Sequence, residues 1–205
     1  FVYLSTAYRA LPAPCAMTDL AAGVDALVGY LLDCGHRRIC FLTGQPDLML
    51  TLKRTEGYAR AYAARGLTCT TAVHICYGYG IKANTDWKET LGGEWRQYAQ
   101  VFPALAASSI QQVSLECYHS HVPPEMMDLL KGKDVMVGVI DVASDVIETP
   151  EQISDTIGMA LQHVPRNRLF PCTNCGLAPM SREVAVKKLE ALAQGAALAR
   201  QRYGA

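Results

Sequence analysis

The sequence predicts an α/β protein in which βα units surround a parallel sheet. Seven short apolar runs have the length and composition of strands, and helical patterns lie between most of them. The apolar runs are continuous instead of alternating, which is typical of strands buried on both faces of a parallel sheet. Strands that alternate with helices favour parallel pairing through right-handed crossovers. The expected fold is therefore a single α/β domain.

The boundaries of these elements follow from apolar runs and from capping signals. Strands are expected over residues 2–6, 13–19, 38–44, 70–77, 112–118, 134–141 and 168–174. Helices are expected over 20–35, 54–66 and 123–132, after Glu148, and from Ser181 onward. Gly35 and Gly66 suit the position after a helix end, and Thr149-Pro150-Glu151-Gln152 has the pattern of a capping box. Seven strands is one fewer than a closed (β/α)8 barrel needs.

Composition excludes several functional classes. Half of the 205 residues are apolar, which allows a substantial core and argues against disorder. Nineteen basic and nineteen acidic residues cancel, so no general field would attract nucleic acid or an anionic membrane. The apolar stretches are too short for a transmembrane helix, and the N-terminal residues lack the basic region of a signal peptide. We therefore expect a cytoplasmic protein that binds neither nucleic acid nor membranes.

Eight cysteines is a high count for this length, and most are expected to be small apolar residues. Without an export signal, a disulfide framework is the weaker interpretation. Cys172 and Cys175 form a Cys-x-x-Cys pair, which could also indicate a redox dithiol or a zinc knuckle, but no thioredoxin-like helix start follows. Cys117 is expected in the core.

Three further patterns have ordinary explanations. His119 and His121 have the spacing of a metal-binding pair, but they precede two prolines in an expected loop and should be partly exposed. Gly78-Tyr79-Gly80 does not complete a dinucleotide-binding fingerprint and is interpreted as a turn. A His-x-Cys pair such as His74 and Cys76 is, taken alone, more often two ordinary buried residues than a pair of metal ligands.

Residues 9–67 contain the run DLAAGVDALVGYLLDCGHRRICFLTG (19–44), followed by RTEGYARAYAARGL (54–67). This segment resembles the effector-binding domain of lac-repressor-family regulators, which have a periplasmic-binding-protein fold. The resemblance implies that Arg54 contacts a small-molecule effector. The alternative for Arg54 is a surface salt bridge at the start of a helix. The family's DNA-binding helix-turn-helix and second lobe are absent from the sequence.

Residues 68–204 contain CTTAVHICYGYG (69–80), SLECYHSHVP (114–123) and FPCTNCGLAPM (170–180). They resemble the cobalamin-independent methionine synthases of the short form. The resemblance implies half of a (β/α)8 barrel and a Zn2+ ion bound by His74, Cys76, Glu116 and Cys175. In that family the zinc activates the thiolate of homocysteine, which accepts a methyl group from a folate.

The positions of these four residues agree with the implied zinc site. His74 and Cys76 are two apart near a strand end, so their side chains should project to one face. Glu116 ends the next expected strand, and Cys175 follows the last. The ends of parallel strands converge on one rim, and one imidazole, two thiolates and one carboxylate can form a tetrahedral zinc set.

The two resemblances together suggest a chimera. We expect a regulator-like fragment over 1–67, similar to periplasmic-binding-protein or flavodoxin-like βα units, fused to a synthase-like half barrel over 68–205 and sharing one continuous sheet. Ala143 stands where the long-form enzymes have a proton-donating histidine, and no segment matches the barrel strands that bind the homocysteine amine.

The main functional hypothesis is accordingly a chimeric scaffold that retains the zinc site and has little or no turnover. The alternatives are a zinc-dependent methyltransferase acting on a thiol such as homocysteine, in methionine synthesis, and a small-molecule binding module.

Overall fold

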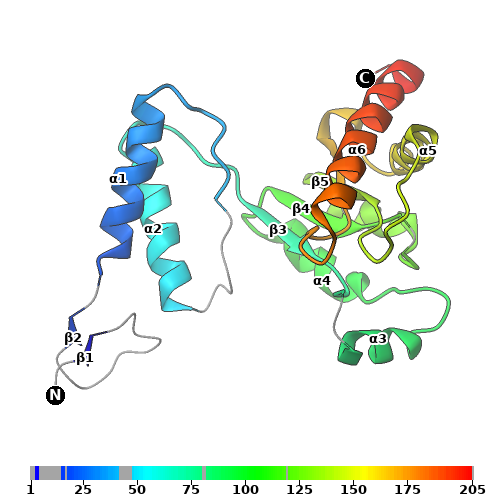
Figure 1. Cartoon of the computed structure of the whole chain (residues 1–205), viewed down its shortest axis with the longest axis horizontal. Helices are drawn as coiled ribbons and strands as arrows, with labels where there is room; N and C mark the ends of the chain where they lie inside the picture. Colours follow the sequence, from blue (N-terminus) through cyan, green and yellow to red (C-terminus); the bar gives the residue numbers. More distant parts are fainter. Residues whose placement is uncertain are drawn as a thin grey trace. The chain divides into compact units, whose positions relative to one another are not determined.

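The computed structural model describes residues 3–4, 15–16, 18–41, 48–79, 82–118 and 120–204. The chain divides into two compact units, Phe1–Cys69 and Thr70–Ala205. The elements of both are labelled in Figure 1. The strands expected over 2–6, 13–19 and 38–44 lie partly outside the described residues. His119 is not among the described residues.

The N-terminal unit is dominated by two helices that pack against each other. They are α1 (Leu20–Asp33) and α2 (Met49–Ala63), which lie side by side in Figure 1. The carboxylate of Asp19 caps α1 by accepting a hydrogen bond from the backbone N–H of Ala22 at 2.9 Å. Gly57 allows the close approach, because a Cβ at this position would lie 2.2 Å from the carbonyl oxygen of Ala21. Two short strands, β1 (Tyr3–Leu4) and β2 (Cys15–Ala16), pair in parallel.

The helix expected over 54–66 begins earlier, at Met49, and ends at Ala63. In this helix Ala61 and Tyr62 are buried and Tyr58 is half-buried, whereas Ala63 is exposed. Their partner is α1, whose Val28 and Leu32 join Ala61 and Tyr62 in one apolar cluster. The spacing of Tyr58, Ala61 and Tyr62 is the helical i, i+3, i+4 pattern.

The C-terminal unit contains a four-stranded parallel sheet in the order β3-β4-β5-β6. Its strands are Ala72–Ile75, Gln112–Glu116, Asp134–Ile140 and Leu169–Thr173. All four were predicted from the sequence. Among the described residues no strand of the N-terminal unit pairs with this sheet, so the single continuous sheet is not found. The fusion to a periplasmic-binding-protein fragment is likewise not supported.

Helical segments connect the strands of this sheet, and α6 follows the last strand. They are α3 (Lys82–Glu89), α4 (Tyr98–Ala107), the 3-10 helix η1 (Pro124–Leu130), α5 (Pro150–Ala160), the 3-10 helix η2 (Arg166–Arg168) and α6 (Arg182–Tyr203). The capping box of α5 is confirmed, because Thr149 and Gln152 exchange side-chain to backbone hydrogen bonds. Ser181 caps α6 in the expected place. Helices α3 and α4 were not predicted from the sequence.

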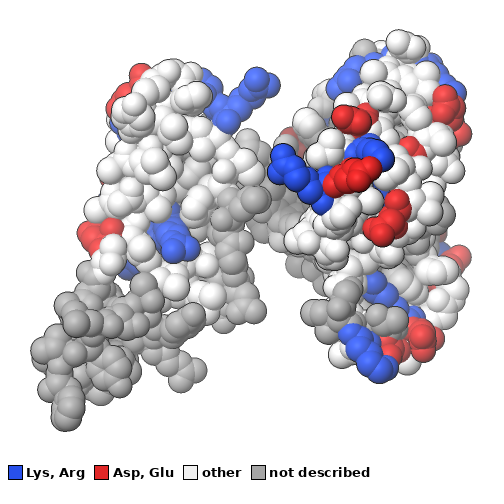
Figure 2. Space-filling view, viewed as in Figure 1, with Lys and Arg blue, Asp and Glu red and all other residues white. Residues whose placement is uncertain are grey.

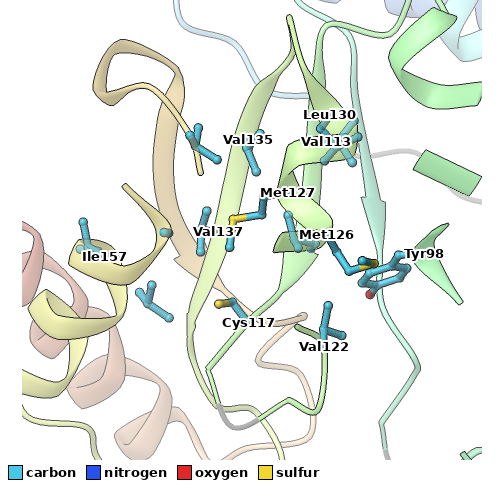
Figure 3. Packing of buried hydrophobic residues seen from close by; sticks show 14 of the residues in the cluster. Tyr98, Val113, Cys117, Val122, Met126, Met127, Leu130, Val135, Val137 and Ile157 are labelled. Atoms are coloured by element: carbon cyan, nitrogen blue, oxygen red, sulfur yellow. The ribbon is translucent and has the colours of Figure 1, made fainter. Parts of the chain in front are cut away.

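The core of this unit lies between the sheet and its helices. In Figure 3, Val113, Val135 and Val137 of neighbouring strands approach Leu130 and Met127 of η1. Val113 and Val135 are register partners, so the apolar side chains of adjacent strands share one face. Cys117 is buried in this core, as predicted.

The other face of the sheet carries polar donors. His74 and Ser114 are register partners on β3 and β4, and they alternate with the core-facing residues. His74 and Ser114 therefore lie on the face of β3 and β4 opposite to Val113.

On the face shown in Figure 2, the described residues carry charges of both signs. None of the helices in the described part of the chain is both long and apolar enough to cross a membrane. Figure 2 shows acidic and basic side chains interspersed on the visible face of the C-terminal unit, in agreement with the balanced composition.

Candidate metal centre

Three predicted donors meet at the carboxyl ends of the strands. His74 lies within β3, Cys76 follows it, and Cys175 follows β6. One ligand atom from each of the three residues lies within 4.8 Å of the other two. The two sulfur atoms are 3.6 Å apart, although the residues are separated by 99 positions. This convergence follows from parallel pairing, which places all four strand ends at the same edge.

The imidazole of His74 is oriented by a neighbouring strand. Its Nδ1 atom forms a hydrogen bond of 2.9 Å with the hydroxyl oxygen of Ser114, and the same oxygen lies 3.8 Å from the sulfur of Cys172. Because Nδ1 is engaged, Nε2 is the nitrogen available to a metal. A ring nitrogen held in this way is a usual feature of metal-binding histidines.

The fourth predicted donor, Glu116, lies outside this group of three. Its side chain is only 1% exposed at the end of β4. Oε1 accepts a 2.6 Å hydrogen bond from the backbone N–H of Tyr77, and Oε2 accepts one from the hydroxyl of Tyr79. The negative charge of Glu116 nonetheless acts on the cluster, because it works to raise the pKa values of His74 and Cys76.

Burial shifts the pKa values of two of the donors, His74 and Cys76. It lowers the pKa of His74, and the charge of Glu116 opposes this shift only partly. Burial also raises the pKa of Cys76 to about 11, and Cys175 and Glu116 add to the increase. At neutral pH the imidazole is therefore neutral, as a metal ligand must be, and the Cys76 thiol stays protonated until a cation stabilises the thiolate.

The donor set suits zinc. One imidazole nitrogen and two sulfurs within a few ångströms are the ligands that zinc prefers, and a catalytic zinc site has three protein ligands and an open fourth position. Magnesium and calcium prefer oxygen ligands, so this set does not suit them.

The other sequence candidates lie elsewhere. Arg54 is exposed in the second turn of α2, in the N-terminal unit, and not at a helix start as expected. His121 is exposed, and its ring lies 5.0 Å from that of Trp95. The sulfur of Cys172 lies 3.8 Å from the hydroxyl oxygen of Ser114. Cys172 is not part of the three-donor group, and Cys172 and Cys175 are both free cysteines. Ala143 donates its N–H to the carboxylate of Asp141 at 2.8 Å.

Two groups of residues were not predicted from the sequence. Ser114 and Tyr79 contact the predicted ligands directly. Ser114 could have been found, because it is two residues before Glu116 and therefore shares its face of β4. The second group is the ion pair of Lys188 with Glu148, buried beneath the loop that follows β5. No local pattern in the sequence signals a pair separated by 40 positions.

Comparison with known proteins gives one family. The family model described as "Cobalamin-independent synthase, Catalytic domain" matches residues 95–198, just over half of the chain. This range includes Glu116 and Cys175.

Individual relatives extend the match over most of the chain. A methionine synthase of Sulfurisphaera tokodaii is 24% identical over 185 residues, which are 89% of this chain and 49% of the relative. One of Saccharolobus islandicus is 27% identical over 189 residues, 89% of this chain and 50% of the relative. The solved structure of a B12-independent methionine synthase from Shewanella sp. W3-18-1, in complex with selenomethionine, is 46% identical. It superposes with a TM-score of 0.64 and covers 92% of this chain and 49% of that one.

These matches bear on the chimera hypothesis. A match over 92% of the chain to one relative includes most of residues 1–67, where we expected a regulator. The regulator-like segment and the chimera are therefore not supported. The chain spans about half the length of the relatives it matches.

Proposed function

Because this chain belongs to the cobalamin-independent synthase family, we propose that it provides the metal-binding and thiol-binding part of a zinc-dependent methionine synthase. The observation that carries this proposal is the convergence of His74, Cys76 and Cys175 within 4.8 Å at the carboxyl edge of the sheet. In the proposed site these three residues hold the zinc, and Glu116 lies beside them as a further carboxylate donor. The chemistry that zinc supplies in such a site is to keep a bound thiol deprotonated at neutral pH.

Three residues at the site have defined roles in this proposal. Ser114 fixes the ring of His74 so that Nε2 faces the metal. Cys76 loses its proton when the metal binds, because a cation removes the cost that burial places on its thiolate. Cys175 is held by a short turn in which the hydroxyl of Thr173 donates to its backbone carbonyl at 2.7 Å.

The proposed substrate is a thiol such as homocysteine, with methionine as the methylated product. Support comes from the Shewanella relative, whose structure contains selenomethionine, the selenium analogue of methionine. The methyl donor is proposed to be a folate. Ala143 offers no proton, so any proton needed by the leaving group must come from another residue or from water.

Zinc content tests the site. Protein prepared without chelators should contain about one zinc per chain, and Cys76→Ser and Cys175→Ser should each lose most of it. Cys34→Ser is the matched control, because Cys34 is an exposed free cysteine in the N-terminal unit and should retain full zinc. Full zinc in both site variants would refute the proposal.

Thiol binding tests the function. In protein loaded with cobalt(II) in place of zinc, homocysteine should add a sulfur-to-metal charge-transfer band, while serine, which has a hydroxyl in place of a thiol, should not. Methyl transfer from methyl-folate to homocysteine is then measured separately. The absence of any spectral change with homocysteine would overturn thiol activation as the role of this site.

A further inference from the structure

Asn174 is an almost fully buried polar residue that stands between β6 and the donor Cys175. Its side chain is 1% exposed. The side-chain oxygen accepts a hydrogen bond of 3.2 Å from the backbone N–H of Cys117, and Nδ2 donates one of 2.7 Å to the carbonyl of Tyr118. Because a backbone N–H can only donate and a carbonyl can only accept, these two bonds fix the orientation of the amide. The residue just before a proposed metal ligand is thus bonded to the residues that follow β4.

This connection crosses β5, which lies between β4 and β6 in the sheet. The crossing is at Gly138, where a Cβ would lie 2.2 Å from Oδ1 of Asn174 and 2.8 Å from its Cα. The backbone N–H of Asn174 also donates to the carbonyl of Ile140 at 2.9 Å, and the N–H of Tyr118 donates to the carbonyl of Gly138 at 2.9 Å. The ends of three strands are therefore joined around one side chain, and the join requires glycine at position 138.

The next residue, Cys175, depends on this join for its position. Cys175 lies beyond the end of β6, so strand pairing alone does not fix it. Its sulfur nevertheless lies 3.6 Å from that of Cys76. We propose that Asn174 is a positioning residue, which holds Cys175 at the metal site by fastening the segment after β6 to the end of β4. This inference rests on the proposed function and adds to it the residue that brings the most distant ligand of the chain into place.

The variant Asn174→Ala removes both side-chain hydrogen bonds. The dissociation constant for zinc should rise by about 10–100-fold, as for other residues that orient a metal ligand. In cobalt-loaded protein without homocysteine, the sulfur-to-metal charge-transfer band should weaken towards that of Cys175→Ser. Asn174→Asp keeps the acceptor and loses the donor, so it should give a smaller change in the same direction. Thr156→Val is the matched control, because it removes a buried hydroxyl that donates to the carbonyl of Gln152 within α5 at 2.9 Å. It should change neither zinc affinity nor the spectrum.

A second measurement follows the position of Cys175 without any metal. In zinc-free protein treated with oxidised glutathione, peptide mass analysis gives the rate at which Cys76 and Cys175 become linked. Asn174→Ala should slow this linking by roughly tenfold or more, because the two sulfurs are no longer held close together. In urea, where the join is absent from both chains, the variant and the wild type should link at the same rate.

Circular dichroism identifies the variants that are folded, and Asn174→Asp takes the place of Asn174→Ala in both measurements if the latter is not. Zinc affinity and a native linking rate equal to those of the wild type in a folded variant would overturn the inference. Equal losses in Thr156→Val would overturn it as well, because they would show a general effect of lowered stability. A wild-type chain that binds no zinc would refute the proposed function, whereas the linking rate would still decide whether Asn174 positions Cys175.

Discussion

Replacing Lys188 with methionine tests how strongly a buried ion pair holds the loop after β5. Lys188 is fully buried in α6, and Glu148 is 5% exposed just before α5. The ammonium lies 2.9 and 3.0 Å from the two carboxylate oxygens and also donates to the carbonyl of Val146 at 2.6 Å. Glu148 accepts a further hydrogen bond from the N–H of Asp141, at the end of β5. The pair thereby connects α6 to the rim of the sheet.

The expected magnitude follows from these distances and the burial. Two unit charges about 3 Å apart attract by about 5–6 kcal/mol at an effective dielectric constant of about 20, and much of this is offset by the desolvation of both ions. Lys188→Met leaves the Glu148 carboxylate buried without its cation. We therefore expect the free energy of unfolding to fall by about 3–5 kcal/mol. For a protein of this size the melting temperature should drop by about 6–20 °C.

Chemical denaturation of a double-mutant cycle measures the effect. Glu148→Gln keeps an acceptor for the backbone N–H of Asp141 but leaves Lys188 charged and buried. This variant should therefore also lower the free energy of unfolding. The double variant Lys188→Met with Glu148→Gln has no buried charge, and its loss should be smaller than the sum of the single losses by about 2 kcal/mol. Single losses below about 1 kcal/mol, or strictly additive losses, would refute the reasoning.

The neighbouring residue provides the control for this cycle. Lys187 also lies in α6 and pairs with Glu183 at 2.7 Å, but these side chains are 55% and 77% exposed. Exposed ion pairs of this kind contribute little to the free energy of unfolding, because water and salt screen the charges. Lys187→Met should therefore change the free energy of unfolding by no more than about 0.5 kcal/mol.

Three further predictions concern the two helices of the N-terminal unit, the start of α5 and the sulfur pair. Gly57→Ala should destabilise the packing of α1 on α2 by about 1–3 kcal/mol, because its Cβ would overlap the α1 backbone. Gly23→Ala should stabilise α1 slightly, because a Cβ at this position has no atom within 4 Å. Chemical denaturation measures both effects. Thr149→Ala should cost about 1 kcal/mol through the lost cap, seen in the same assay. Mild oxidation of zinc-free protein should join Cys76 to Cys175, whose sulfurs are 3.6 Å apart, and zinc should prevent it; peptide mass analysis detects the link.

Each of these has a contradicting outcome. Equal stability of Gly57→Ala and Gly23→Ala would show that the two helices do not pack as closely as described. An unchanged Thr149→Ala variant would show that other groups satisfy the first turn of α5. Oxidation that instead joins Cys172 to Cys175 would revive the dithiol interpretation of that pair.

The sequence by itself determined much of the C-terminal unit. Apolar runs predicted β4 and β5. In β5 the residues after Asp134 are apolar at every position, as a strand buried on both faces requires. Capping chemistry is local, so Thr149 and Ser181 marked the starts of α5 and α6 correctly. The two-residue spacing of His74 and Cys76 predicted that their side chains project to one face, and their ligand atoms lie within 4.8 Å of each other.

Local patterns failed where the signal was weak or absent. Pro103 lies inside α4, and a proline ordinarily argues against a helix interior. In α3, Trp87 is the only large apolar residue, so no apolar stripe marks the helix. The helix over 54–66 was predicted, but its packing against α1 was not, because a local pattern indicates a helix without showing what covers it.

Only the tertiary structure decided the arrangement of the site. Cys76 and Cys175 are 99 positions apart and Lys188 and Glu148 are 40 apart, so their contacts depend on the path of the whole chain. The sequence placed Glu116 at the correct strand end, but it could not show that Tyr79 holds the carboxylate. Local chemistry determines the residues at which a strand ends. The register of the strands and the path of the crossovers determine which donors point at one another, and both are properties of the folded sheet.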